Sequence, residues 1–165
     1  MSARTEVVSF RIYPDRTRKR PWYWKVFVFE NREAMLIFWR EQCRIQGRTG
    51  AEAREDFAAV TATWTIVYES PGKKPDRCIG HVLFYRQRLG AGIVAHEMGH
   101  VMLRWAETWL KIPAKDLYHG RGGAAGRTAH RNEERVLHVL GDLVAQFWTR
   151  FYDRVPPGWL KKALR

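Results

Sequence analysis

The chain has few cysteines and no long uninterrupted apolar run, and these two absences limit the classes of protein to which it can belong. Its 2 cysteines, Cys43 and Cys78, lie far apart in the sequence and form no CxxC pair. A small secreted domain stapled by disulfides would need more of them, so we expect two reduced thiols. The longest apolar stretches, around Trp22–Phe29 and Ile93–Leu103, are too short or too interrupted to span a bilayer, so we expect no membrane association.

Acidic residues are also scarce, because 17 Asp and Glu stand against 29 Lys and Arg. The resulting net charge of +12 favours anionic partners such as nucleic acid or acidic protein surfaces, and it carries no information about the fold. The segment Met1–Arg20 has eight charged residues before any apolar run, so we expect no signal peptide. Together with the few cysteines, this predicts a cytoplasmic protein.

Apolar residues make up 45% of the 165 residues, enough for one core, so we expect one domain over residues 1–165. Runs rich in β-branched and aromatic residues predict strands, and apolar positions spaced three to four apart predict helices. The predicted strands are Glu6–Tyr13, Trp22–Glu30, Ala58–Glu69 and Arg77–Arg86, and the predicted helices are Asn31–Gln46, Ala91–Lys111 and Asn132–Tyr152. This order predicts an α+β fold with a small, mostly antiparallel sheet.

The segment His96-Glu97-Met98-Gly99-His100 is an HExxH pattern within the predicted helix Ala91–Lys111. Residues four apart share one face of a helix, so both imidazoles reach a single ion. Zinc accepts imidazole nitrogen and lowers the pKa of a bound water, from which Glu97 is placed to take a proton as general base. With 6 histidines in the chain, chance produces the pattern in only about 1–2% of such sequences.

The face of the helix that carries the histidines supports a metal site over a structural role. At about 100° per residue, His96 and His100 lie opposite an apolar stripe that would face the core. Two core histidines satisfied by hydrogen bonds would lie on the stripe itself. The residues of the stripe are Val94, Met98, Val101, Met102, Trp105 and Trp109.

A third protein ligand is needed, and the sequence leaves it open. Glu133 falls on the apolar face of the helix Asn132–Tyr152, where a carboxylate is costly unless it is paired or bound to metal. Glu134 lies off that face, and both acids also suit the first turn of a helix capped by Asn132. His119 is the other candidate. We predict Glu133.

Two further segments beside this site carry predictions. If Arg77–Arg86 is an edge strand, its free backbone groups would pair with an extended peptide along Gly80–Phe84. The glycine-rich segment Gly120–Gly126 is predicted to be either a lid over the site or a flexible linker.

These residues resemble the gluzincins, zinc peptidases with HExxH and a downstream glutamate on a second helix. Within that group the chain looks most similar to minimal zincins of the ImmA/IrrE type and to related phage-encoded metallopeptidase domains. The resemblance rests on His96, Glu97, His100 and the acidic pair Glu133-Glu134, and it covers about Arg77 to Phe151. It implies a zincin-like fold, a Zn²⁺ cofactor and limited proteolysis of a protein substrate in a bacterial or phage setting.

A second resemblance is to SprT and Spartan-like proteases, which take a third histidine from an HG segment such as His119-Gly120 and act near DNA. Basic residues beside aromatics, from Arg16 to Trp24, also suit single-stranded nucleic acid, but we favour a solvated turn that leads into a strand with core aromatics. The sequence therefore predicts a zinc metalloendopeptidase. The alternative is a basic, phage-borne module that binds nucleic acid or a host protein and retains a zinc site without peptidase activity.

Overall fold

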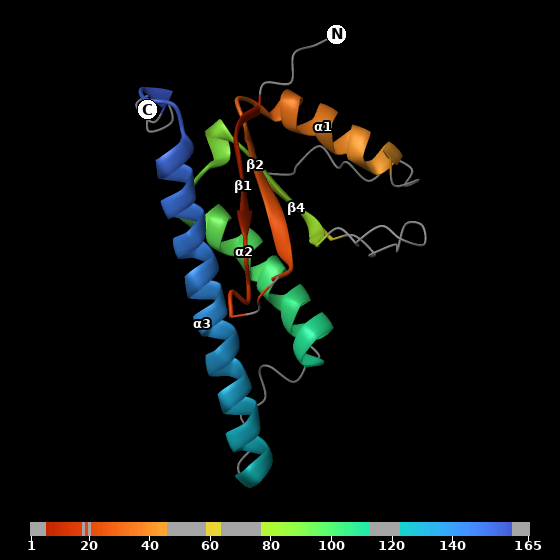
Figure 1. Cartoon of the computed structure of the whole chain (residues 1–165), viewed down its shortest axis with the longest axis vertical. Coiled ribbons are helices and arrows are strands. Elements are labelled where there is room, and N and C mark those ends of the chain that lie inside the picture. The colour runs from red at the N-terminus through yellow and green to blue at the C-terminus, as the bar shows by residue number, and fades with distance from the viewer. Residues whose placement is uncertain are drawn as a thin grey trace.

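A four-stranded sheet lies between one helix on one face and two helices on the other (Figure 1). This arrangement belongs to a computed structural model that describes residues 6–17, 19, 21–45, 59–63, 77–112 and 123–159, with only the backbone described for 59–63 and 123–130. The α+β class expected from the sequence is confirmed. None of the helices in these ranges has the length and apolar character that a bilayer span requires.

The strands are β1 (Glu6–Ile12), β2 (Tyr23–Phe29), β3 (Ala59–Thr63) and β4 (Cys78–Tyr85). Their order across the sheet is β1-β2-β4-β3. The pairs β1/β2 and β3/β4 are antiparallel, whereas β2 and β4 are parallel. The sheet is therefore mixed, with two of its three pairings antiparallel.

The prediction that the segment Arg77–Arg86 forms an edge strand is wrong. β4 pairs with β2 on one side and with β3 on the other, and β3 is in register with Gly80–Phe84. The backbone groups that were expected to accept a peptide are already used within the sheet. The order of strands depends on pairing between distant segments, which the local pattern of β4 does not encode.

Side chains alternate between two cores because successive residues of a strand point to opposite faces. On one face, β2 and β4 pack against α1 (Arg32–Ile45). On the other face, the strands pack against α2 (Ala91–Trp105) and α3 (Gly123–Arg154). The residues of β1, β2 and β4 with less than 3% exposure on this second face are Phe10, Ile12, Trp24, Val26, Val28, Val82 and Phe84.

Helix α1 begins where the sequence predicted. The side chain of Asn31 accepts a hydrogen bond at 2.9 Å from the backbone N–H of Ala34, which is the capping contact expected of an asparagine in that position. The helix ends at Ile45, within one residue of the predicted boundary.

Helix α3 begins at Gly123, nine residues before the predicted start at Asn132. The segment expected to be either a lid or a linker is thus helical from Gly123 to Gly126, and residues 120–122 lie outside the described ranges. Each glycine costs a helix only about 1 kcal/mol, and alanines at 124, 125 and 129 favour the helical state. Propagation from a long packed helix adds one hydrogen bond per residue, which outweighs the glycine penalty.

Trp159, at the C-terminal end of the described chain, contacts the residues that directly follow β2 and β4. Its indole Nε1 donates to Glu30 at 2.7 Å, and the guanidinium of Arg86 lies 4.4 Å from the centre of its ring. Arg86 also forms an ion pair with Glu30. Trp159 is only 8% exposed, so this contact closes one end of the core on the α2–α3 face.

Candidate metal centre

The two histidines of the HExxH pattern converge on the outer face of α2. Their Nε2 atoms lie 3.1 Å apart, and the two rings are perpendicular with centroids 4.7 Å apart. Both side chains are exposed, so this face is open to solvent. The expected sharing of one helix face by residues four apart is therefore confirmed.

The opposite face of α2 holds the helix against the sheet and α3. Val94, Met98 and Val101 are fully buried, and Met102 and Trp105 are each 4% exposed. The predicted apolar stripe is thus confirmed, with Trp109 half-buried at its end. Because the stripe fixes the rotation of the helix, the histidine pair has no freedom to turn inward.

Glu97 lies between these two faces. At about 100° per residue it follows His96 toward the buried stripe, and its side chain is only 6% exposed. Among the described residues, Glu97 and Gln146 are the two buried polar or charged side chains. Glu97 is therefore held at the boundary between the exposed histidine pair and the buried stripe.

The separation of the two nitrogens fits a shared zinc ion. Two imidazole nitrogens bound at about 2.1 Å with the tetrahedral angle would lie about 3.4 Å apart. The observed 3.1 Å is close to that separation and needs only a small adjustment of either rotamer. The same separation suits a hydrogen bond between the rings when one Nε2 carries a proton.

Within the described ranges, no group of three His, Cys, Asp or Glu side chains lies close enough to hold a metal ion, so Glu133 does not join the pair. The guanidinium of Arg135 lies 5.8 Å from the ring centre of Trp105, which puts this part of α3 beside the C-terminal end of α2. His100 is five residues before Trp105, or about 7.5 Å along the helix axis. The identity of the third ligand stays a prediction.

The other candidates are distributed as follows. Glu133 is half-buried, and Glu134 is exposed. Because α3 begins well before Asn132, neither glutamate occupies a first turn, and that explanation of the acidic pair is wrong. His119 lies outside the described residues.

Glu107 is on the same side of the helix as His100 and forms a surface ion pair, with 2.8 Å between its Oε2 and Nη1 of Arg104. It lies in the short π-helical turn Ala106–Leu110 that follows α2 and ends at Lys111, which has a positive φ of 56°. The predicted helix Ala91–Lys111 is therefore continuous in space but changes its hydrogen-bonding pattern after Trp105.

Sequence reasoning missed Gln146, the second buried polar residue. Its amide accepts from the backbone N–H of Tyr13 at 3.0 Å and donates to the carbonyl of the same residue at 2.9 Å. It also donates to Asp142 at 2.7 Å. A polar residue between the buried Leu143 and Phe147 was the available signal, because an amide in that position needs a partner.

The chain was compared with protein-family models, curated proteins and solved structures, and none of them matches. The case for a function therefore depends on the residues of this chain and their geometry.

Proposed function

We propose that the chain is a zinc-dependent metallopeptidase. The observation that carries this proposal is the convergence of the His96 and His100 Nε2 atoms to 3.1 Å on an exposed helix face, with the buried carboxylate of Glu97 next to them. A helix that buries its apolar stripe, turns two imidazoles to solvent and holds one carboxylate at the boundary between the two faces supports a site built for chemistry. The zincin-like fold suggested by the sequence is part of the same proposal.

Zn²⁺ is the metal that suits these ligands, since it accepts neutral imidazole and prefers four-coordinate sites with one open position. His96 and His100 would hold it. The third ligand proposed from the sequence is Glu133, which does not lie with the pair in this structure and would reach it only after a shift of α3 along α2. When bound there, the ion would supply Lewis acidity and a water of lowered pKa.

Glu97 would act as the general base. It follows His96 directly on α2, and its burial limits the rotamers of its side chain. It would accept a proton from the attacking water and deliver it to the nitrogen of the leaving amine. The substrate class is a peptide bond in a protein or peptide.

The sheet limits where an extended substrate would pair. In the described sheet, β1 and β3 are the outer strands, and a side chain of α3 already reaches the backbone of β1, since Arg154 donates to the carbonyl of Ser9. We therefore assign an incoming peptide strand to the outer edge of β3, next to α2. This replaces the earlier expectation for β4.

A Glu97→Gln variant tests the base. We expect cleavage of an unstructured protein substrate to fall by about 10²–10⁴-fold, because the amide cannot accept the proton. Zinc content and thermal stability should match wild type, since the amide keeps the size of the side chain. A Glu107→Gln variant is the matched control, because it removes an exposed acid on the same face and should leave the rate unchanged.

If Glu97→Gln cleaves as fast as wild type, the peptidase assignment is wrong. If the wild-type protein binds zinc but cleaves nothing, the alternative of a binding module with a structural zinc site is favoured instead.

A further inference from the structure

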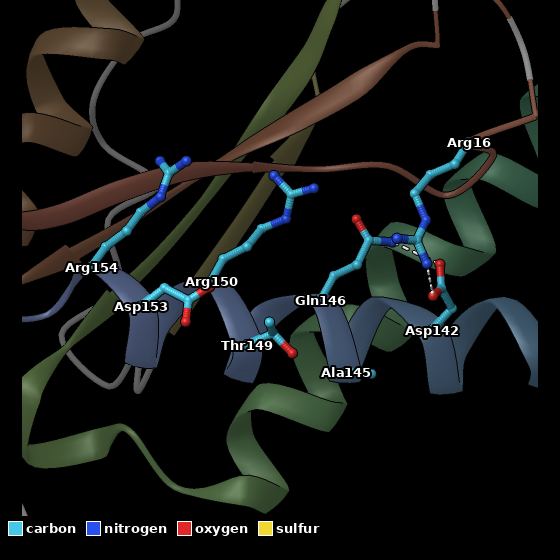
Figure 2. Close-up of a pocket in the computed structure, with 8 residues that line it drawn as sticks. All are labelled: Arg16, Asp142, Ala145, Gln146, Thr149, Arg150, Asp153 and Arg154. Atoms are coloured by element: carbon cyan, nitrogen blue, oxygen red, sulfur yellow. Dashed lines mark hydrogen bonds and ion pairs between the residues drawn. The ribbon is translucent and has the colours of Figure 1, made fainter.

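Two adjoining hollows run along the side of the molecule where α3 meets β1. One of about 420 Å³ is lined by residues of α3 and by Arg16 (Figure 2), and the other, of about 390 Å³, is lined mainly by β1 and β2. Arg150 and Arg154 line both. We refer to the two together as the basic groove, with five lining cations: Arg11, Arg16, Lys25, Arg150 and Arg154.

The spacing of polar residues on α3 builds one wall of the basic groove. Asp142, Gln146, Arg150 and Arg154 are four residues apart, so they share one face of the helix. Figure 2 shows these four side chains pointing from α3 toward the strand beside it. Arg154 reaches the strand and donates to the backbone carbonyl of Ser9 at 3.0 Å.

The charge is unevenly distributed along the groove. At one end Arg16 forms an ion pair with Asp142, which offsets its charge. The hollow over the strands is lined by the other four cations, and no acidic side chain is among its described lining residues. Asp153 belongs to the helix-side hollow. An anion would therefore bind best between Arg150 and the strands.

Aromatic rings hold three of these cations in place, and one of them is Lys25, whose ammonium lies 4.7 Å from the ring centre of Phe27. The guanidinium of Arg150 lies 5.3 Å from the ring centre of Tyr13, and that of Arg11 lies 4.4 Å from the ring centre of Tyr23. The two tyrosine rings are themselves 6.1 Å apart. Arginines stacked in this way lose less conformational freedom when they bind an anion, so the site is partly preorganised.

We propose that the basic groove binds the phosphate backbone of a nucleic acid strand. Arginine forks match phosphate oxygens in pairs. The four cations that line the strand-side hollow, which has no acidic side chain among its described lining residues, suit a chain of regularly spaced anions. The net charge of +12 adds long-range attraction to such a polyanion. The sequence pointed instead to the turn from Arg16 to Trp24, where Arg18 and Arg20 lie outside the described residues.

The basic groove is separate from the proposed metal centre. It follows β1, which forms one edge of the sheet, whereas β3 forms the other edge. The proposed peptide site beside β3 and the nucleic acid site beside β1 would therefore be occupied independently. Nucleic acid binding does not depend on zinc or on peptidase activity, and a metal chelator should leave it unchanged.

The test is fluorescence anisotropy with a labelled single strand and with the matching duplex, between about 50 and 200 mM salt. The groove variant combines Arg11→Gln, Lys25→Gln and Arg150→Gln, which keeps Arg154 in its contact with β1. Counterion release predicts a loss of about fivefold per phosphate contact at 0.1 M salt for a single strand, or about a hundredfold for three. The slope of log K against log salt should fall by about 2 for the single strand and by almost 3 for the duplex.

The matched control combines Arg40→Gln, Arg44→Gln and Arg88→Gln, three exposed cations that do not line the groove. It removes the same net charge and should weaken binding by less than about threefold. Equal weakening by both triple variants would overturn the proposal, because it would show attraction by diffuse charge alone. Arg150→Gln alone, with an expected loss of about fivefold, keeps the test decisive if the triple variant does not fold.

Two other results would also overturn the proposal. One is the absence of measurable binding by wild type to either form at the lowest salt. The other is equally tight, groove-dependent binding of an acidic peptide, which would make a protein surface the partner. Tighter binding of the single strand or of the duplex supports the proposal and identifies the form.

Discussion

Replacement of Gln146 by alanine should destabilise the protein, because one amide joins α3 to the end of the β1–β2 hairpin. The side chain is 4% exposed and makes three hydrogen bonds, two with the backbone of Tyr13 and one with Asp142. The variant leaves the backbone N–H and C=O of Tyr13 without these partners. Since Tyr13 is half-buried, each lost bond is worth about 1 kcal/mol, and the cavity adds about 1 kcal/mol more.

The expected loss is thus about 2–4 kcal/mol in the free energy of unfolding, measured by urea denaturation with tryptophan fluorescence. A Gln146→Leu variant restores most of the volume but neither backbone bond, so it should recover only the cavity part of the loss. Thr149→Ala, an exposed change on the same helix, should stay within about 0.5 kcal/mol of wild type. A loss below about 1 kcal/mol for the alanine variant, or a leucine variant as stable as wild type, would refute the reasoning.

Two other perturbations follow from the fold and the proposed centre. Trp159→Ala should destabilise the protein by about 3–5 kcal/mol, because it removes a buried ring and strips Arg86 and Glu30 of their indole partner; a urea midpoint unchanged from wild type would contradict this. Free zinc at a hundredfold above its Kd should add about 2.7 kcal/mol of stability, a rise in Tm of about 5–11 °C for a domain of this size. Calorimetry should show no such rise for His100→Ala, and the same rise in that variant would place the zinc elsewhere.

The sequence predicted those parts of the fold and site that depend on local periodicity. The helix that carries His96, the direction of its apolar stripe and the Asn31 cap all follow from residues within one or two turns of each other. The same holds for strands β1, β2 and β4, whose bounds differ from the predicted ones by at most one residue at each end.

Features that depend on distant segments were missed. The internal position of β4 is set by its pairing with β3 and β2, and neither partner is visible in the sequence of β4 itself. The start of α3 was misplaced because a run of glycines suggests a loop until the rest of the helix is packed. The helical period placed Leu137 on the predicted apolar face of α3 and left Leu143 out of it. Leu137 is 52% exposed whereas Leu143 is fully buried, so the predicted face was rotated. The same rotation moves Glu133 away from the centre of that face.

The third ligand is hard to predict for the same reason. Its identity depends on how far α3 slides along α2, and the connection between them, residues 113–122, lies outside the described ranges. Local pattern fixes which residues share a helix face, but it does not fix the register of two helices.

Metal content tests the central claim most directly. Elemental analysis of the purified protein, together with titration of the metal-free form, should give one zinc ion per chain for wild type. His96→Ala and His100→Ala should lose that ion, and Glu133→Ala should bind it more weakly. Wild-type protein that takes up no zinc, or histidine variants that retain a full equivalent of it, would contradict the account.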